Sequence, residues 1–465
     1  MAGLDTRIVL IGLPTIGESL RAQLETLLWV TQGYQIALTI GLLFLGRFTD
    51  IFGRVKIYNL GFAIFTFGSG LCVFAQTGEE LVVFRIIQGL GGAMLIANSA
   101  ALITDATPAE ELGFALGVNQ IAFTLGAVLG LTVGGVLIDT TGWRMIFTLN
   151  VPIGIFGTLW AHFRLHEIAQ VEKHARFDYP GFFFFTTSLT SLLLAISLVT
   201  MASISDFGAA MLYLISTVTF VLFVYFEMRT PEPLLDMRLF KIRLFSAGNV
   251  SQFLYSLGFG SLSLIIILYL QVIRGYNALT AGILFLPLDV AFVTVGPLSG
   301  RLSDRHGTRW LATLGMGVGT VGYVALAFLL TINTPIEQIE IILILLGVGL
   351  GLFSSPNMSS VMGSVPAQRR GVASAVRATV FNTGNVISIG LVAYIITTVI
   401  PYQVVSGLIT GGYSTLTPGE SLGFVTGIGH AFIVTAIITL AGMFASSLRG
   451  PETKNHGSHT DPAIA

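Results

Sequence analysis

GRFTDIFGRVK at residues 46–56 and GRLSDRHGTRW at residues 300–310 are two copies of one short basic stretch. Each copy follows a long apolar run and precedes another. The recurring positions are Gly46, Arg47, Asp50 and Gly53 in the first copy, and Gly300, Arg301, Asp304 and Gly307 in the second. A repeat at equivalent places in two halves is typical of a duplicated membrane transporter. We expect each copy to form a loop between two spans.

The composition also indicates a membrane protein. The chain of 465 residues is 53% hydrophobic and only 10% charged, whereas soluble domains carry about 25% charged residues. The net charge of -1 gives no field that would attract nucleic acid. Cys72 is the only cysteine, which excludes intrachain disulfides and cysteine-based metal sites. The glycine-rich strings lack the lysine and the strand–turn–helix setting of a nucleotide-binding loop, so we expect no cofactor and no metal.

Apolar runs of roughly 20 residues are long enough to cross a bilayer as helices. The sequence holds about fourteen of them, centred near residues 8, 36, 67, 92, 125, 154, 191, 218, 257, 288, 320, 350, 386 and 435. Most Lys and Arg residues fall in alternate loops, so the positive-inside rule predicts that both termini are cytoplasmic and that the protein lies in the cell membrane. The first run is short before Gly17 and Glu18, which favours a translation start upstream of Met1.

Two polar linkers divide the chain. We expect a six-helix N-terminal bundle at 1–163, a linker with two additional transmembrane helices at 164–243, a six-helix C-terminal bundle at 244–447 and a disordered cytoplasmic tail at 448–465. The predicted fold class is therefore an all-α polytopic membrane protein with a plan of six, two and six spans. We expect a monomer.

Several motifs resemble the major facilitator superfamily, and within it the fourteen-span drug:proton antiporter family. Besides the repeated stretch, the matching segments are LDTRIVLIGLPTI (4–16), LVVFRIIQGLGGAM (81–94), WRMIFTLNVPIG (143–154) and PLLDMRLFKIRLF (233–245). Two positions depart from the family pattern. Arg7 replaces a threonine of the first-span signature, and Leu131 replaces a proline of the fifth-span antiporter signature. The second departure weakens the inference to proton antiport.

The resemblance implies a gating role for the repeated stretch. Asp50, held by Arg47 and Arg54, would face the helix that begins at 370–371 and would favour its N-terminus by about 0.3–1 kcal/mol. Asp304 would face the fifth span in the same way. The alternative is ordinary loop solvation combined with membrane orientation.

Ionisable residues inside a membrane are costly and are functional candidates by default. Asp5 and Asp289 are the two acidic residues well inside predicted spans, and Arg85 lies in the fourth span beside Gln88. Asp5 is expected to accept a proton, to bind a cation, or to pair with Arg7 or Arg85. Asp289 either exchanges protons or is a protonated structural residue, and Arg85 either tunes a nearby acid or reaches toward the interface.

Other polar residues of the spans are candidates for the substrate cavity or for hydrogen bonds between helices. They are Tyr34, Gln35, Asn119, Gln120, Asn249, Gln252, Tyr255, Asn382 and Asn385. Four glycines of the fifth span predict close helix packing: Gly126, Gly130, Gly134 and Gly135.

The leading hypothesis is therefore a secondary active transporter that exports hydrophobic or cationic small molecules in exchange for protons by alternating access. The alternative is a facilitator or metabolite exporter without tight proton coupling. A membrane sensor is disfavoured, because such a sensor needs a folded regulatory domain and the longest loop, at 401–422, is too small.

Overall fold

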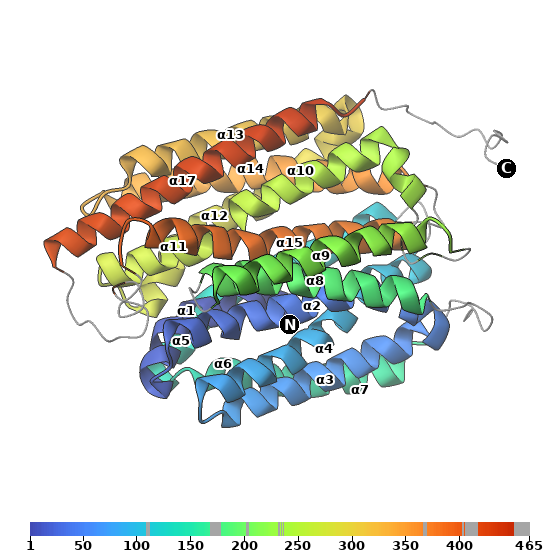
Figure 1. The fold of residues 1–465 in the computed structure, drawn as a ribbon, viewed down its shortest axis with the longest axis horizontal. Coiled ribbons are helices and arrows are strands. Elements are labelled where there is room, and N and C mark those ends of the chain that lie inside the picture. Colours follow the sequence, from blue (N-terminus) through green and yellow to red (C-terminus); the bar gives the residue numbers. More distant parts are fainter. Residues whose placement is uncertain are drawn as a thin grey trace.

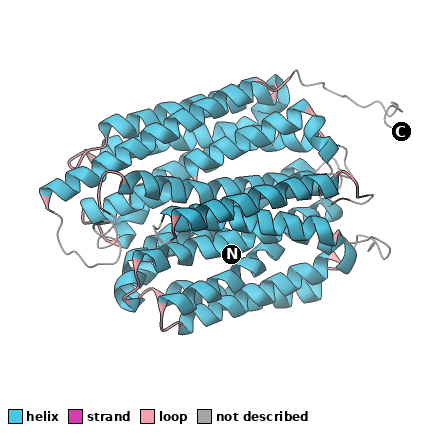
Figure 2. Cartoon of the chain, in the orientation of Figure 1, coloured by secondary structure: helices cyan, strands magenta, loops and turns pink. Residues whose placement is uncertain are grey.

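The computed structural model describes residues 1–107, 112–167, 178–200, 204–230, 233, 235, 237–365, 370–401, 404 and 417–450. These residues form helices and connecting turns, with no strand among them (Figure 2). The helices in chain order are α1 (Ala2–Leu20), α2 (Leu24–Phe52), α3 (Arg54–Phe74), α4 (Gly78–Ala106), α5 (Leu112–Thr141), α6 (Arg144–Thr148), α7 (Asn150–Arg164), α8 (Tyr179–Thr200), α9 (Asp206–Glu227), η1 (Met237–Lys241), α10 (Arg243–Phe259), α11 (Leu262–Leu268), η2 (Tyr269–Ile273), α12 (Ala278–His306), α13 (Thr308–Leu329), α14 (Ile336–Gly363), α15 (Arg370–Thr397) and α17 (Pro418–Ser447).

A helix covers each of the predicted span centres. Eleven segments of the described chain are long and apolar enough to cross a membrane. The all-helical prediction is therefore confirmed, whereas the count of fourteen spans stays a prediction. The ninth predicted span is interrupted, because α10 ends at Phe259 and the chain continues through α11 into a π-helical turn, η2.

The repeated basic stretch is mostly helical, which differs from the expected loop. α2 continues to Phe52 and α12 to His306, so each turn to the next helix is reduced to one glycine. Gly53 has φ of 98° and Gly307 has φ of 88°. Residues other than glycine rarely adopt that backbone conformation. The recurrence of these two glycines thus follows from the tight turn that both copies make.

The helices gather in two groups with α8 and α9 between them (Figure 1). In the blue group, α1 packs on α5, and α2 and α3 pack on α4. In the yellow-to-red group, α14 packs on α12 and α13, while α17 packs on α10 and α13. The two groups meet along α5 with α12 and along α2 with α15.

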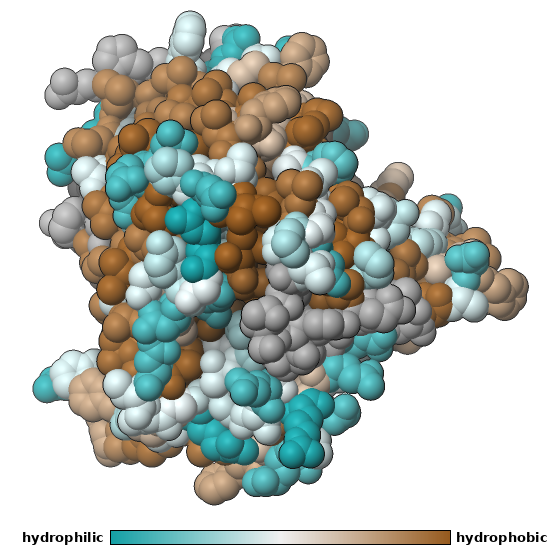
Figure 3. Space-filling model, turned by 90° about the vertical axis from the view of Figure 1, so that its left-hand side faces the viewer, coloured by the Kyte–Doolittle hydropathy of each residue, from teal (hydrophilic) through white to brown (hydrophobic). Residues whose placement is uncertain are grey.

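One apolar core joins the two groups at the end of the molecule that holds the α1–α2 turn. It contains Ile11 and Ile16 of α1 together with Ile265 of α11 and Phe285 of α12. Gln271 Nε2 also donates to the Ile11 carbonyl oxygen at 3.3 Å. Figure 3 looks onto this end of the molecule, where hydrophilic residues cross the face between hydrophobic flanks.

Candidate functional site

Asp5 lies at the centre of a buried polar cluster in the N-terminal group of helices. Its Oδ2 accepts a hydrogen bond from Arg85 Nη1 at 2.5 Å, and its Oδ1 accepts from Gln88 Nε2 and Asn150 Nδ2, each at 2.9 Å. Gln88 also donates to Ser69 Oγ at 2.7 Å. We call these five residues the Asp5 cluster. All are at most 1% exposed, so the carboxylate is compensated by an arginine and by two amides in a site that excludes solvent.

Arg85 is fixed from all sides. Its Nη1 donates to Gln88 Oε1 at 2.6 Å, and its Nε donates to the Val30 carbonyl oxygen at 3.2 Å. The guanidinium lies 4.1 Å from the centre of the Tyr34 ring, a favourable cation–π distance. Arg85 therefore pairs with the acid of the first helix and does not reach toward the interface.

Arg7 and Asp289 form a second ion pair, which connects the two groups of helices. Arg7 Nη1 lies 2.6 Å from Asp289 Oδ1 and 2.7 Å from Oδ2. Asp5 and Arg7 are two residues apart on α1 and point about 200° apart around the helix axis. The Asp5 side chain thus points into the N-terminal group of helices, and the Arg7 side chain reaches α12. The Arg7 side chain is 16% exposed and that of Asp289 is 1% exposed.

The predicted gating residues are only partly placed. Several of them lie outside the part of the chain whose side chains are described: Gly46, Arg47, Asp50, Asp304 and the helix start at 370–371. Gly300 packs against the Ser355 side chain, and Arg301 is exposed. The N-terminus of α3 instead binds Glu167, whose carboxylate accepts from the Arg54 and Val55 backbone N–H groups at 2.8 and 3.0 Å.

The predicted cavity residues of the N-terminal group lie in different surroundings. Tyr34 is buried against Arg85, Gln35 is partly exposed, and Asn119 accepts a hydrogen bond from Ser99 at 3.0 Å. The side chain of Gln120 lies outside the described residues. These residues do not converge on one described pocket.

In the C-terminal group, polar residues bond to neighbouring helices or to their own backbone. Asn357 Nδ2 donates to Gln252 Oε1 at 3.0 Å, and the buried Arg449 donates to Asn357 Oδ1. Asn249 Nδ2 donates to the Phe245 carbonyl oxygen at 2.9 Å, and Asn382 Nδ2 to that of Ala378 at 2.8 Å. Asn385 lies against Gly260.

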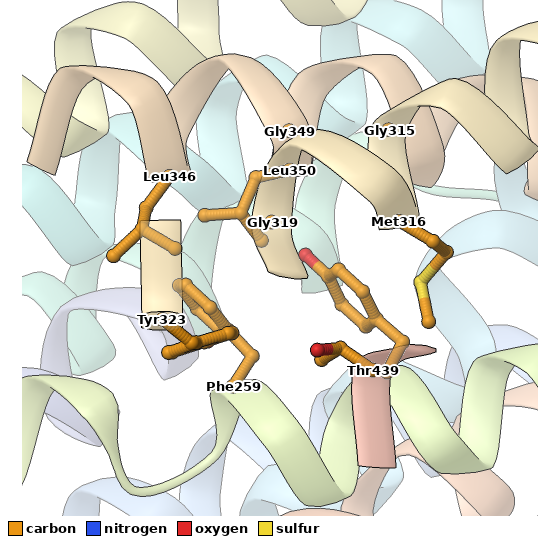
Figure 4. Close-up of a pocket in the computed structure, with 10 residues that line it drawn as sticks. Phe259, Gly315, Met316, Gly319, Tyr323, Leu346, Gly349, Leu350 and Thr439 are labelled. Carbon is orange, nitrogen blue, oxygen red and sulfur yellow. The ribbon is translucent and has the colours of Figure 1, made fainter. Parts of the chain in front are cut away.

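Tyr255 lines a small, mostly apolar pocket inside the C-terminal group. The Tyr255 ring lies 4.4 Å from the Phe353 ring and 5.8 Å from the Phe259 ring. The other side chains that line it are Met316, Tyr323, Leu346, Leu350 and Thr439, and glycines of α13 and α14 leave the space open (Figure 4). The pocket is too small for a drug-sized ligand, since such sites span about 300–1,000 Å³.

The four glycines of α5 lie at helix contacts. A Cβ on Gly130 would lie 2.5 Å from the Leu4 carbonyl oxygen, and one on Gly126 would lie 3.3 Å from the Leu4 nitrogen. Gly134 faces Ile8 of α1, whereas Gly135 faces the Leu279 backbone of α12. The side chain of Leu131 lies outside the described residues.

Sequence reasoning missed Ser69 and Asn150 as members of the Asp5 cluster, and Arg449 and Asn357 as a buried pair. The sequence could have indicated Asn150, because this residue belongs to the segment 143–154 that resembles the family pattern. Arg7 was recognised as a departure, but its pairing with Asp289 depends on residues 282 positions apart. No local pattern encodes such a contact.

Comparison with known proteins gives a consistent result. The family model of the Major Facilitator Superfamily matches residues 1–389. The chain is 32% identical over 384 residues to the riboflavin transporter RibZ of Clostridioides difficile, covering 82% of each chain. It is 28% identical over 377 residues to Multidrug resistance protein 3 of Bacillus subtilis, covering 80% of this chain and 72% of that one. It is also 28% identical over 398 residues to the multidrug efflux pump LfrA of Mycolicibacterium smegmatis, covering 85% and 78%.

Among solved structures, the human organic anion transporter MFSD10 has a TM-score of 0.62 at 13% identity, covering 94% of this chain and 97% of that one. A peptide transporter of the POT family has the same TM-score, 0.62, at 15% identity and covers 98% of each chain. At these identities the likeness concerns the fold alone.

Proposed function

Because the chain belongs to the Major Facilitator Superfamily, whose members are membrane transporters and not enzymes, we propose that it exports hydrophobic small molecules in exchange for protons. The multidrug efflux relatives support export of such molecules. In the proposed orientation, both termini and the α2–α3 turn face the cytoplasm, as the positive-inside rule predicts.

The Arg7–Asp289 ion pair is the observation that carries the proposed coupling. It joins the two groups of helices that must move relative to each other in alternating access. Protonation of Asp289 removes one partner and weakens the contact between α1 and α12. A proton and a substrate can then favour different conformations, which is the differential affinity that coupling requires.

The two acidic residues take different roles in this proposal. The Arg7 side chain of the Asp289 pair is 16% exposed, whereas Asp5 is fully enclosed. We therefore assign proton exchange to Asp289. We propose that the Asp5 cluster fixes the rotation of α1 about its axis, and that this rotation directs Arg7 toward α12.

The test is proton release from reconstituted liposomes with an acidic lumen, recorded while either the cation ethidium or the anion fluorescein is added outside. We expect substrate-dependent release by the unmodified protein and its loss in Asp289→Asn. An exposed acid, Asp206→Asn, is the matched control. Loss in Asp5→Asn but not in Asp289→Asn would move the coupling site to α1. No release with ethidium, riboflavin or fluorescein would refute proton-coupled export.

A metabolite exporter without tight proton coupling is the second candidate. The relative of 32% identity is named a riboflavin transporter, and Leu131 and Arg7 depart from the antiporter pattern. Riboflavin flux that does not change with the pH gradient would favour this alternative.

A further inference from the structure

Arg377 of α15 is a cation within a candidate span that has no counter-ion in the described part of the chain. The ion pairs found there join Arg85 with Asp5 and Arg7 with Asp289. The Nε of Arg377 is buried and has no hydrogen-bond partner among the described residues. Charged groups inside a membrane are normally paired, so an unpaired arginine is a candidate for ligand binding.

The position of Arg377 on α15 can be derived from its neighbours. Ala378 packs against the apolar cluster of α2, and Val376 packs against the cluster around Phe245. Arg377 lies about 100° from each of them around the helix. It therefore lies on the arc of α15 between these two contacts, where it is partly buried.

Asn249 of α10 lies at the same level as Arg377. A Cβ on Gly384 would lie 2.6 Å from the Ser256 Cβ, and Ser388 Oγ donates to Ser261 Oγ at 3.0 Å, so α15 and α10 run in parallel in this contact. Arg377 precedes Gly384 by seven residues, and Asn249 precedes Ser256 by seven residues. Seven residues are two helical turns, so both lie on the faces where α10 and α15 meet.

Asn249 also has an unused polar atom. Its side chain is 4% exposed, and its Oδ1 has no hydrogen-bond partner in the described structure. A buried carbonyl oxygen without a partner costs free energy. An unpaired donor on Arg377 and an unpaired acceptor on Asn249 thus lie at the same level of the contact between α10 and α15.

The C-terminal helices that surround this region carry few acidic residues. The sequences of α10, α13 and α15 contain no Asp or Glu. The acidic residues of α14 and α17 are Glu337, Glu340 and Glu420, which lie near the first turns at the opposite end. The buried Arg449 is bonded through Asn357 to Gln252, which is three residues from Asn249 on α10.

We propose that Arg377 and Asn249 form a binding site for an organic anion, with the Arg377 guanidinium on the anionic oxygen and Asn249 Oδ1 on a neighbouring N–H or O–H group. This inference deepens the proposed export function and rests on it. It assigns a substrate class opposite in charge to the cations that the sequence suggested.

The test uses two dyes that share a xanthene ring system but differ in charge, fluorescein as the anion and rhodamine 6G as the cation. Binding to the purified full-length protein in lipid nanodiscs is measured by fluorescence anisotropy at pH 8. We expect fluorescein to bind about tenfold more tightly than rhodamine 6G, and Arg377→Gln to weaken fluorescein binding by about tenfold or more. Arg377→Lys should retain most of the affinity, and the exposed Lys241→Gln should change nothing.

Asn249→Asp is the second variant, in case Arg377→Gln does not fold. The new carboxylate would pair with Arg377, so fluorescein binding should weaken and rhodamine 6G binding should strengthen. The proposal is overturned by tighter binding of rhodamine 6G to the unmodified protein, by absence of fluorescein binding, or by unchanged fluorescein affinity in the variants. Binding is measured without a gradient, so it is separable from the proton-release test of the proposed function.

Discussion

Asp5 receives three hydrogen bonds from side chains of α4 and α7, so a single carboxylate holds together three helices. Replacement by asparagine keeps the size but leaves Arg85 without its counter-ion. Breaking a buried ion pair by removing one partner costs about 3–5 kcal/mol. We expect Asp5→Asn to lower the free energy of unfolding by that order, measured by denaturant titration of the purified protein.

Two further variants separate the charge from other effects. Asp5→Asn combined with Arg85→Gln should recover part of the loss, because no buried charge remains unpaired. Glu18→Gln, at an exposed position of the same helix, should leave stability unchanged. Equal stability of Asp5→Asn and the unmodified protein would contradict the structural role of the cluster.

At the scale of the helices, α5 approaches α1 through glycine. A methyl group on Gly130 would meet the Leu4 backbone, next to Asp5, so α5 must move outward. Overpacking of this kind costs about 1–3 kcal/mol. We expect Gly130→Ala to lower the thermal unfolding temperature, while Gly70→Ala in α3, where nothing lies within 4 Å of the new methyl, should not. A stable Gly130→Ala protein would show that α5 is free to shift.

The two tight helix–helix turns depend on their glycines in a different way. The backbone of Gly53 and Gly307 lies in a region that other residues enter at a cost of about 1–3 kcal/mol. We expect Gly53→Ala and Gly307→Ala each to lower the unfolding temperature. At Gly53 the new methyl would also lie 2.8 Å from Glu167 Oε2. An unchanged unfolding temperature in either variant would show that its turn tolerates a side chain.

At the scale of the whole molecule, the Arg7–Asp289 pair and the shared apolar core hold the two groups of helices together at the end of the α1–α2 turn. Removing the charge of Asp289 should loosen that end. We expect spin labels at Thr140 and Asn333 to show a larger population of long distances in Asp289→Asn, measured by double electron–electron resonance. Asp206→Asn should leave the distances unchanged, and an unaltered distribution in Asp289→Asn would refute this role of the pair.

The sequence predicted the helical fold and the family correctly, because apolar length and the repeated stretch are local signals. It also identified Asp5, Arg85 and Asp289 as buried ionisable residues. It did not determine their partners. The sequence left both Arg7 and Arg85 as possible partners of Asp5, and only the packing of the helices assigns Arg85 to it. The sequence also could not predict which residues lie near Arg377, because these depend on how α10 and α15 are aligned.

The separation of Arg7 and Asp289 also bears on biosynthesis. The two residues are 282 positions apart, and ribosomes add about 5–20 residues per second, so the first helix waits roughly 15–55 s for its counter-ion. During that time an arginine within the bilayer costs about 2.5–3.5 kcal/mol on the insertion scale. We therefore expect α1 to stay near the translocon or at the membrane interface until α12 emerges.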